Sequence, residues 1–118
     1  MTLAGKRILL VEDEAVIAFA VEDMLLDLGC EVVGPAFRLD DAQRMAAAEG
    51  IDAAILDVNL NEQQSFPIAA LLKERGIPFL FATGYAEGGV GWSEETIVIA
   101  KPYSRTQLSR ALDQLLAT

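Results

Sequence analysis

Five side chains that could do phosphate or metal chemistry stand at the ends of short apolar runs. In chain order they are Glu12 and Asp13, Asp57, Thr83 and Lys101. Taken singly, an acid, a threonine or a lysine after a strand is more often a cap or a solvated side chain. Together they combine carboxylates, a hydroxyl and an ammonium group. That set suits a cation and the oxygens of a phosphoryl group.

Three carboxylates brought close together would repel one another. At about 4 Å and an effective dielectric near 20, each like-charge contact costs roughly 4 kcal/mol. Either their pKa values rise or a divalent cation neutralises them, and all-oxygen ligation favours Mg²⁺. Asp57 would then be the nucleophile of a phosphoryl transfer, with Lys101 stabilising the developing charge and Thr83 fixing the geometry.

The elements that must position these residues alternate between strand and helix. Helices are expected over residues 14–28 and 40–48, from an N-cap at Ser65 to about residue 75, and from a capping box at Ser104. The strands between them are expected over 7–11, 31–34 (ended by Pro35), 53–57, 77–82 and 96–100. This order predicts one domain, 1–118, with a doubly wound, five-stranded parallel α/β sheet. Ligands of such sheets bind at the carboxyl edge.

The fourth helix is expected to be short or replaced by a loop. Residues 86–95 contain three glycines in the run 87–91, and each costs a helix roughly 1 kcal/mol relative to alanine.

The first helix carries a candidate docking surface. Its apolar stripe predicts that six residues face the sheet: Ile17, Ala20, Val21, Met24, Leu25 and Leu28. The opposite side leaves one aromatic residue among small ones, which suits close packing of a partner helix. We expect the docking residues to be Ala15, Ala18, Phe19 and Glu22, with Pro102 and Tyr103 nearby. Scattered surface apolar residues need no such role, so the alternative stays open.

Composition limits the classes of function. The 118 residues carry a net charge of −9 with nine scattered Lys and Arg, which argues against binding nucleic acid. One cysteine excludes an internal disulfide, and the lack of histidine argues against a zinc site. No apolar run is long enough to span a membrane, and the N-terminus lacks a secretory signal. We therefore expect a cytoplasmic protein.

The whole chain resembles the response-regulator receiver family, the CheY-like domains. The resemblance rests on Leu10-Val11-Glu12-Asp13, Leu56-Asp57-Val58-Asn59, Ala82-Thr83 and Lys101-Pro102. It implies a (βα)5 flavodoxin-like fold with strand order 2-1-3-4-5 and a cis Lys101–Pro102 bond. After Asp57, residues 61–65 lack the Pro-Gly pair of many receivers, so a mobile loop is expected there.

The resemblance also implies residue roles. Asp57 would accept a phosphoryl group from a histidine kinase or a histidine phosphotransferase. Mg²⁺ would be bound by Asp13, Asp57 and the main-chain carbonyl of Asn59, with Glu12 acting through water. Thr83 and Lys101 would contact the phosphoryl group, and the protein would catalyse only its own phosphorylation and dephosphorylation.

A narrower resemblance rests on residues 78–85, Pro-Phe-Leu-Phe-Ala-Thr-Gly-Tyr. This stretch looks like the PFxFATGY signature of the single-domain "FAT GUY" receivers, whose usual partners are HWE/HisKA2 kinases. Val98 stands where typical receivers have a switch aromatic. Thr83 and Tyr85 are therefore the expected switch residues. The same residues could also form only a buried strand and the turn at its carboxyl end, with no role in switching.

Several functional interpretations remain open on the sequence. The chain could be a stand-alone switch or phosphate sink, with a monomer favoured. A haloacid-dehalogenase-type, Mg²⁺-dependent phosphohydrolase is a second class, but it needs an Asp two positions after the nucleophile, where Asn59 stands. A toprim-type nuclease fails for the same reason. A receiver-like module that binds partners without phosphorylation is a third class.

Overall fold

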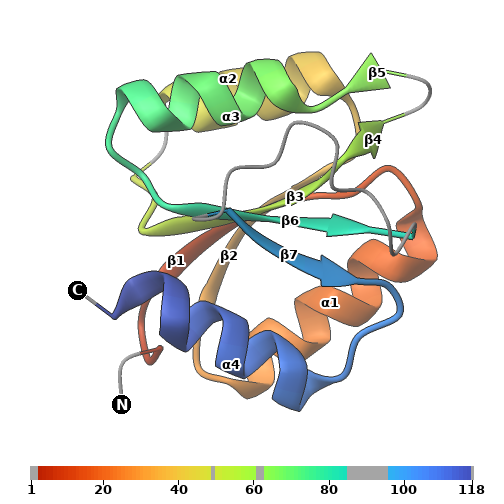
Figure 1. The fold of residues 1–118 in the computed structure, drawn as a ribbon, viewed down its shortest axis with the longest axis vertical. Coiled ribbons are helices and arrows are strands. Elements are labelled where there is room, and N and C mark those ends of the chain that lie inside the picture. Colours follow the sequence, from red (N-terminus) through yellow and green to blue (C-terminus); the bar gives the residue numbers. More distant parts are fainter. Residues whose placement is uncertain (1–2, 49, 61–62, 85–95, 118) are drawn as a thin grey trace.

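A computed structural model describes residues 3–48, 50–60, 63–84 and 96–117 (Figure 1). Its centre is a parallel sheet in the order β2-β1-β3-β6-β7. The strands are β1 (Arg7–Val11), β2 (Glu31–Ala36), β3 (Ala53–Asp57), β6 (Phe79–Thr83) and β7 (Ile97–Ala100). Counted in chain order, the five parallel strands follow the predicted order 2-1-3-4-5, and the expected fold class is confirmed.

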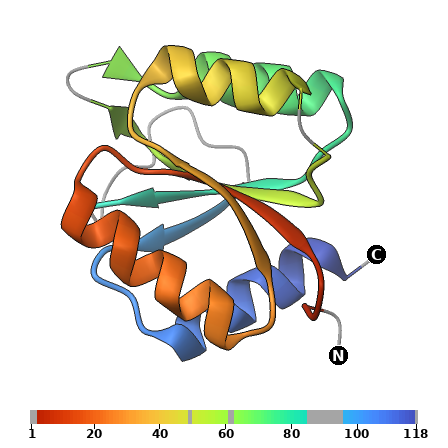
Figure 2. The same ribbon diagram turned by 180° about the vertical axis from the view of Figure 1, so that it is seen from behind.

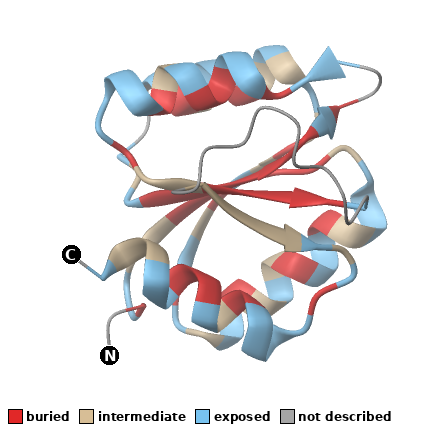
Figure 3. Ribbon diagram, in the orientation of Figure 1, coloured by how far each residue is buried: buried red, intermediate tan, exposed pale blue. Residues whose placement is uncertain are grey.

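Helices cover both faces of this sheet. On one face lie α1 (Ala15–Asp27) and α4 (Arg105–Leu116), and on the other α2 (Leu39–Ala48) and α3 (Phe66–Glu74) (Figures 1 and 2). Alternate strand residues feed the two layers, so Ile8 and Leu10 pack with α1 and α4. Leu9 and Val11 pack with α2 and α3. Every residue of β3 is buried, because this central strand is covered on both faces (Figure 3).

The second strand is longer than predicted. It runs through Pro35 to Ala36 and shifts its register against β1 between Leu9 and Val11. Proline is tolerated because β2 is an edge strand, where a missing N–H leaves no neighbour unpaired. The bulge requires glycine: Gly34 has φ +100°, and a Cβ there would lie 2.8 Å from the nitrogen of Ala36.

The predicted face of α1 is partly wrong. Val21 and Leu25 are buried as predicted, but Ala18 is fully buried and Ala20 is exposed. Residues 18, 21 and 25 follow the i, i+3, i+7 spacing, so they form the centre of the stripe that faces the sheet. Ala18 therefore cannot belong to a docking surface.

The strand pairing between β3 and α3 was not predicted. A small antiparallel hairpin follows Asp57, made of β4 (Asn59–Leu60) and β5 (Gln63–Gln64). Ser65 occupies the N-cap position of α3, as predicted, but its side chain makes no capping hydrogen bond. Its hydroxyl is fully buried and has no hydrogen-bond partner among the described residues.

Two sequence predictions around the last strand and helix are confirmed. The Lys101–Pro102 peptide bond is cis. Ser104 and Gln107 form a reciprocal capping box at the start of α4, with the Gln107 N–H donating to Ser104 Oγ over 3.1 Å. The expectations for the fourth helix and for Tyr85 fall on residues 85–95, outside the described residues. Within the described ranges, no helix is both long enough and apolar enough to span a membrane.

Candidate functional site

The five residues singled out from the sequence gather at the carboxyl edge of the sheet. Asp57 and Thr83 are the last residues of β3 and β6, while Glu12 follows β1 and Lys101 follows β7. The strands are in register there, with Asp57 opposite Ala82 and Thr83 opposite Ala100. The parallel topology thus brings together side chains that lie up to 89 positions apart in the chain.

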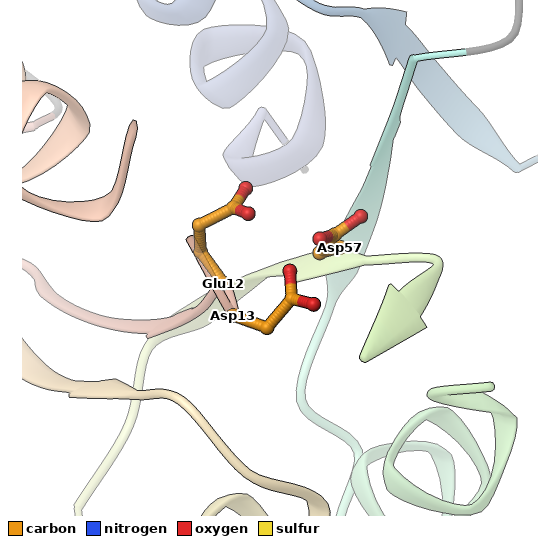
Figure 4. A group of neighbouring side chains, drawn as sticks. All are labelled: Glu12, Asp13 and Asp57. Atoms are coloured by element: carbon orange, nitrogen blue, oxygen red, sulfur yellow. The ribbon is translucent and has the colours of Figure 1, made fainter. Parts of the chain in front are cut away.

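Three carboxylates form a compact cluster at this edge. Glu12, Asp13 and Asp57 each offer an oxygen, and these oxygens all lie within 4.8 Å of one another (Figure 4). Glu12 and Asp57 are buried, with exposed fractions of 3% and 6%. Few waters can reach them, so their mutual repulsion is poorly screened.

Lys101 lies between two of these acids. Its Nζ is 3.1 Å from Glu12 Oε1 and 3.4 Å from Asp57 Oδ2. Burial alone would lower the pKa of Lys101, but the charge of Asp57 and the hydrogen bond and charge of Glu12 raise it overall. The ammonium group therefore stays charged and faces the carboxylate of Asp57.

One lysine does not offset the acids. Burial, followed by the charge of Glu12, raises the pKa of Asp57 from 3.8 to about 8, against the opposing effect of Lys101. A group that resists ionisation beside two other acids is a place where a divalent cation would be strongly favoured. The donor set is all carboxylate oxygen, which fits a hard ion such as Mg²⁺.

Thr83 is held beside this cluster by the main chain. Its carbonyl accepts a 2.8 Å hydrogen bond from the Lys101 N–H, which joins the ends of β6 and β7. The side chain is buried, with an exposed fraction of 4%. The hydroxyl donor and the ammonium group therefore come from adjacent, linked positions.

A cavity of about 620 Å³ runs from the acidic cluster along α1. Asp13, Asp57, Asn59 and Lys101 line its charged end. Its apolar wall was not predicted, because four of its residues were assigned to the sheet-facing stripe of α1: Ile17, Ala20, Val21 and Met24. The signal that could have located them is that α1 begins two residues after Asp13, so the helix starts at the acidic cluster.

The predicted docking residues are only partly at the surface. Phe19 is 52% exposed and contacts Phe37 edge to face, with ring centroids 6.1 Å apart. Ala15 and Pro102 are exposed and Glu22 is half-buried. Tyr103, however, is buried, and burial followed by the charges of Glu12 and Asp57 raises its pKa. Its ring packs in the layer beneath α4 and also lines the cavity, so Tyr103 lies near the predicted docking residues but presents little surface to a partner.

Val16, which belongs to neither predicted face of α1, is 83% exposed. It is the most exposed large apolar residue among those described. Its position three residues before Phe19 on the same helix was the available signal.

Comparisons with known proteins point to one class. No family model matches the chain. The phyllosphere-induced regulator PhyR of Methylorubrum extorquens AM1 is 32% identical over 115 residues, which is 93% of this chain and 43% of PhyR. This chain therefore spans less than half the length of that relative. Among solved structures, the response regulator PhyR from Brucella abortus superposes with a TM-score of 0.86 at 27% identity, covering 98% of this chain and 50% of PhyR.

Two further structures match along nearly their whole length. SdrG from Sphingomonas melonis Fr1 is 38% identical, with a TM-score of 0.81, covering 98% of this chain and 99% of SdrG. The receiver domain of the sensor histidine kinase PA1611 from Pseudomonas aeruginosa PAO1 is 27% identical, with a TM-score of 0.84, covering 98% and 100%. In that structure a magnesium ion is coordinated in the active-site cleft.

Fold and site together define a doubly wound α/β domain with three clustered carboxylates at the carboxyl edge of its sheet, where a metal ion could be held. The chain belongs to the response-regulator receiver family. Its class is that of signalling proteins.

Proposed function

We propose that Asp57 accepts a phosphoryl group in an Mg²⁺-dependent reaction. The observation that carries this proposal is the placement of Lys101, whose Nζ lies 3.4 Å from Asp57 Oδ2 and 3.1 Å from Glu12 Oε1. A helix cap does not need a buried carboxylate that faces an ammonium group and lies close to two further acids. It provides a nucleophile, a positive charge and a cation site around one cavity.

The chemistry follows from the charges of these residues. An Asp57 oxygen attacks the phosphorus, and the bond from phosphorus to the donor nitrogen or oxygen breaks, so that the donor leaves with the bonding electrons. Lys101 and the Thr83 hydroxyl stabilise the phosphoryl oxygens as charge builds up on them.

Asp13, Asp57 and the Asn59 carbonyl would hold Mg²⁺, with Glu12 acting through water. The bound ion would supply positive charge that keeps Asp57 ionised. Glu12 is suited to its role by its existing contacts: it accepts a hydrogen bond from the Glu14 N–H (3.2 Å) and pairs with Lys101.

The test of phosphorylation is an intact mass measurement. The protein is incubated with acetyl phosphate and Mg²⁺, and one phosphoryl group should be gained. Asp57→Ala should abolish the gain, while Asp23→Ala, at an exposed position on α1, should keep it. A phosphoryl group that remains on the Asp57→Ala protein would overturn the assignment.

We propose that the natural donor is a histidine kinase, of HWE/HisKA2 type, or a histidine phosphotransferase. The 78–85 motif supports membership of the "FAT GUY" group, and with it a role as a signalling switch or a phosphate sink. The donor would dock on α1, where Phe19 is exposed and the exposed Val16 lines the cavity that leads to Asp57.

A matched pair of α1 variants tests this docking surface. Phe19→Glu should slow phosphotransfer from a cognate kinase at least about tenfold, because a buried interface aromatic contributes about 2 kcal/mol or more. Leu26→Glu introduces the same charge at an equally exposed apolar site about 10 Å further along the helix, and should transfer normally. Acetyl phosphate should phosphorylate both variants at the wild-type rate. Equal transfer rates for the two variants would exclude the surface.

For the readout of phosphorylation we propose Thr83 and Tyr85. Val98 lies half-buried in β7 and packs on the core beside α2 and α3, so it offers no aromatic ring to rotate. Beryllofluoride should therefore change amide hydrogen exchange in residues 83–95. Unchanged exchange there would rule out this readout.

A further inference from the structure

The hairpin that follows Asp57 has a defined hydrogen-bond register. Asn59 pairs with Gln64 and Leu60 with Gln63. One step closer to the sheet, the Ser65 N–H donates to the Val58 carbonyl over 2.9 Å. The hairpin is therefore a continuous ladder that begins at the residue next to Asp57.

This register leaves the Asn59 carbonyl without a partner on β5. In an antiparallel pair, hydrogen-bonded and non-hydrogen-bonded positions alternate. Since Val58 and Ser65 share a bond, Asn59 and Gln64 form the non-bonded pair, and Leu60 and Gln63 the next bonded one. The main-chain N–H and C=O of Asn59 consequently point away from β5. Asn59 also lines the cavity together with Asp13 and Asp57.

The ladder is anchored at both ends. The Val58 N–H donates to the Ala82 carbonyl over 3.1 Å, which fixes the base of the hairpin to β6. Leu60 is 1% exposed and packs into the core with α2 and α3. The two Gln side chains of β5 are exposed, so β5 contributes through its main chain.

We propose that the β4–β5 ladder positions the Asn59 carbonyl as a ligand for the divalent cation, with the main-chain N–H of Gln63 as the positioning group. The inference rests on the proposed function, because it concerns the same cation site. It assigns a role to the main chain of Gln63, a residue whose exposed side chain carries no chemistry of its own.

The alternation supplies a matched pair of variants. Gln63→Pro deletes an N–H that bonds across the ladder, whereas Gln64→Pro deletes one that points outward in the non-bonded pair. Mg²⁺ affinity is measured by isothermal titration calorimetry on the full chain. Gln63→Pro should bind Mg²⁺ about tenfold more weakly, the lower end of the effect of losing a ligand's supporting hydrogen bond. Gln64→Pro should bind within about twofold of wild type.

A second readout separates positioning from a loss of fold. At saturating Mg²⁺ the rate of acetyl phosphate labelling of Gln63→Pro should return to the wild-type rate, because only the Mg²⁺ dependence is shifted. In the wild-type chain, Mg²⁺ should also slow exchange of the Leu60 and Gln63 amides, a test that needs no variant. Equal Mg²⁺ affinity of the two proline variants, or unchanged exchange of these amides, would overturn the positioning role. Failure of the wild-type chain to bind Mg²⁺ would overturn the proposed function as well.

Discussion

Asp57→Asn should stabilise the metal-free protein. The pKa of Asp57 is raised from 3.8 to about 8, first by burial and then by the charge of Glu12. The folded chain therefore binds a proton at Asp57 more tightly than the unfolded chain does. This contribution to stability is complete below about pH 3.8, falls as the pH rises, and is lost above about pH 8.

The size of the effect follows from this linkage. About three pH units separate the unshifted pKa of 3.8 from neutral pH, and each is worth about 1.4 kcal/mol. The raised pKa of Asp57 therefore lowers the free energy of unfolding at pH 7 by roughly 4 kcal/mol, compared with a pH at which Asp57 is protonated in both states. An amide at the same position ionises at no pH, but it gives Lys101 a weaker partner at 3.4 Å. We therefore expect a net gain of roughly 2 kcal/mol at pH 7, increasing towards pH 8.

Urea unfolding followed by circular dichroism measures the difference. Wild type, Asp57→Asn and the exposed-site control Asp23→Asn are compared in chelator between pH 5 and pH 8. The gain for Asp57→Asn should shrink by more than about 1 kcal/mol from pH 8 to pH 6. The control should show a small difference that does not vary with pH. An Asp57→Asn protein less stable than wild type at pH 8, or a gain independent of pH, would refute the electrostatic reasoning.

Three further predictions concern stability. Millimolar Mg²⁺ should raise the melting temperature of the wild type, because the ion binds only the folded chain, and it should raise that of Asp57→Asn by less than half as much; equal shifts would contradict the cation site. Ser65→Ala should stabilise the protein by about 1 kcal/mol in urea unfolding, since the Ser65 hydroxyl is buried without a partner among the described residues. Ser104→Ala should cost about 1 kcal/mol in the same assay, because it removes the α4 capping box; a change below about 0.3 kcal/mol would count against the cap.

Most residues of the site could be predicted from the sequence, because the carboxyl ends of parallel strands lie at the same edge of a sheet. Continuous apolar runs identified β1, β3 and β6, and each run ended on a residue that could do chemistry. Once the alternation of strand and helix predicted a parallel sheet, Asp57, Thr83 and Lys101 had to meet. The Ser104 capping box was equally local, since a four-residue pattern fixes it.

Features that depend on how the elements pack against one another were predicted less accurately from the sequence. Ala18 and Ala20 both fit an apolar stripe, and only the rotation of α1 against the sheet decides which of them is buried. Tyr103 was grouped with the docking residues, and only its packing under α4 shows that its ring is buried. For α1 the sequence supplies the amphipathic pattern, and packing against the sheet determines which residues of the pattern are buried.

The order of the elements and the residues at their ends could be predicted, since apolar periodicity and turn residues are local signals. The position of Lys101 between Glu12 and Asp57 could not, because it depends on contacts between β1, β3 and β7. The hairpin register depends on pairing between Asn59 and Gln64 and on the burial of Leu60, neither of which a residue pattern encodes. The chemistry was thus visible in the residue types, and its geometry arose from contacts between distant segments.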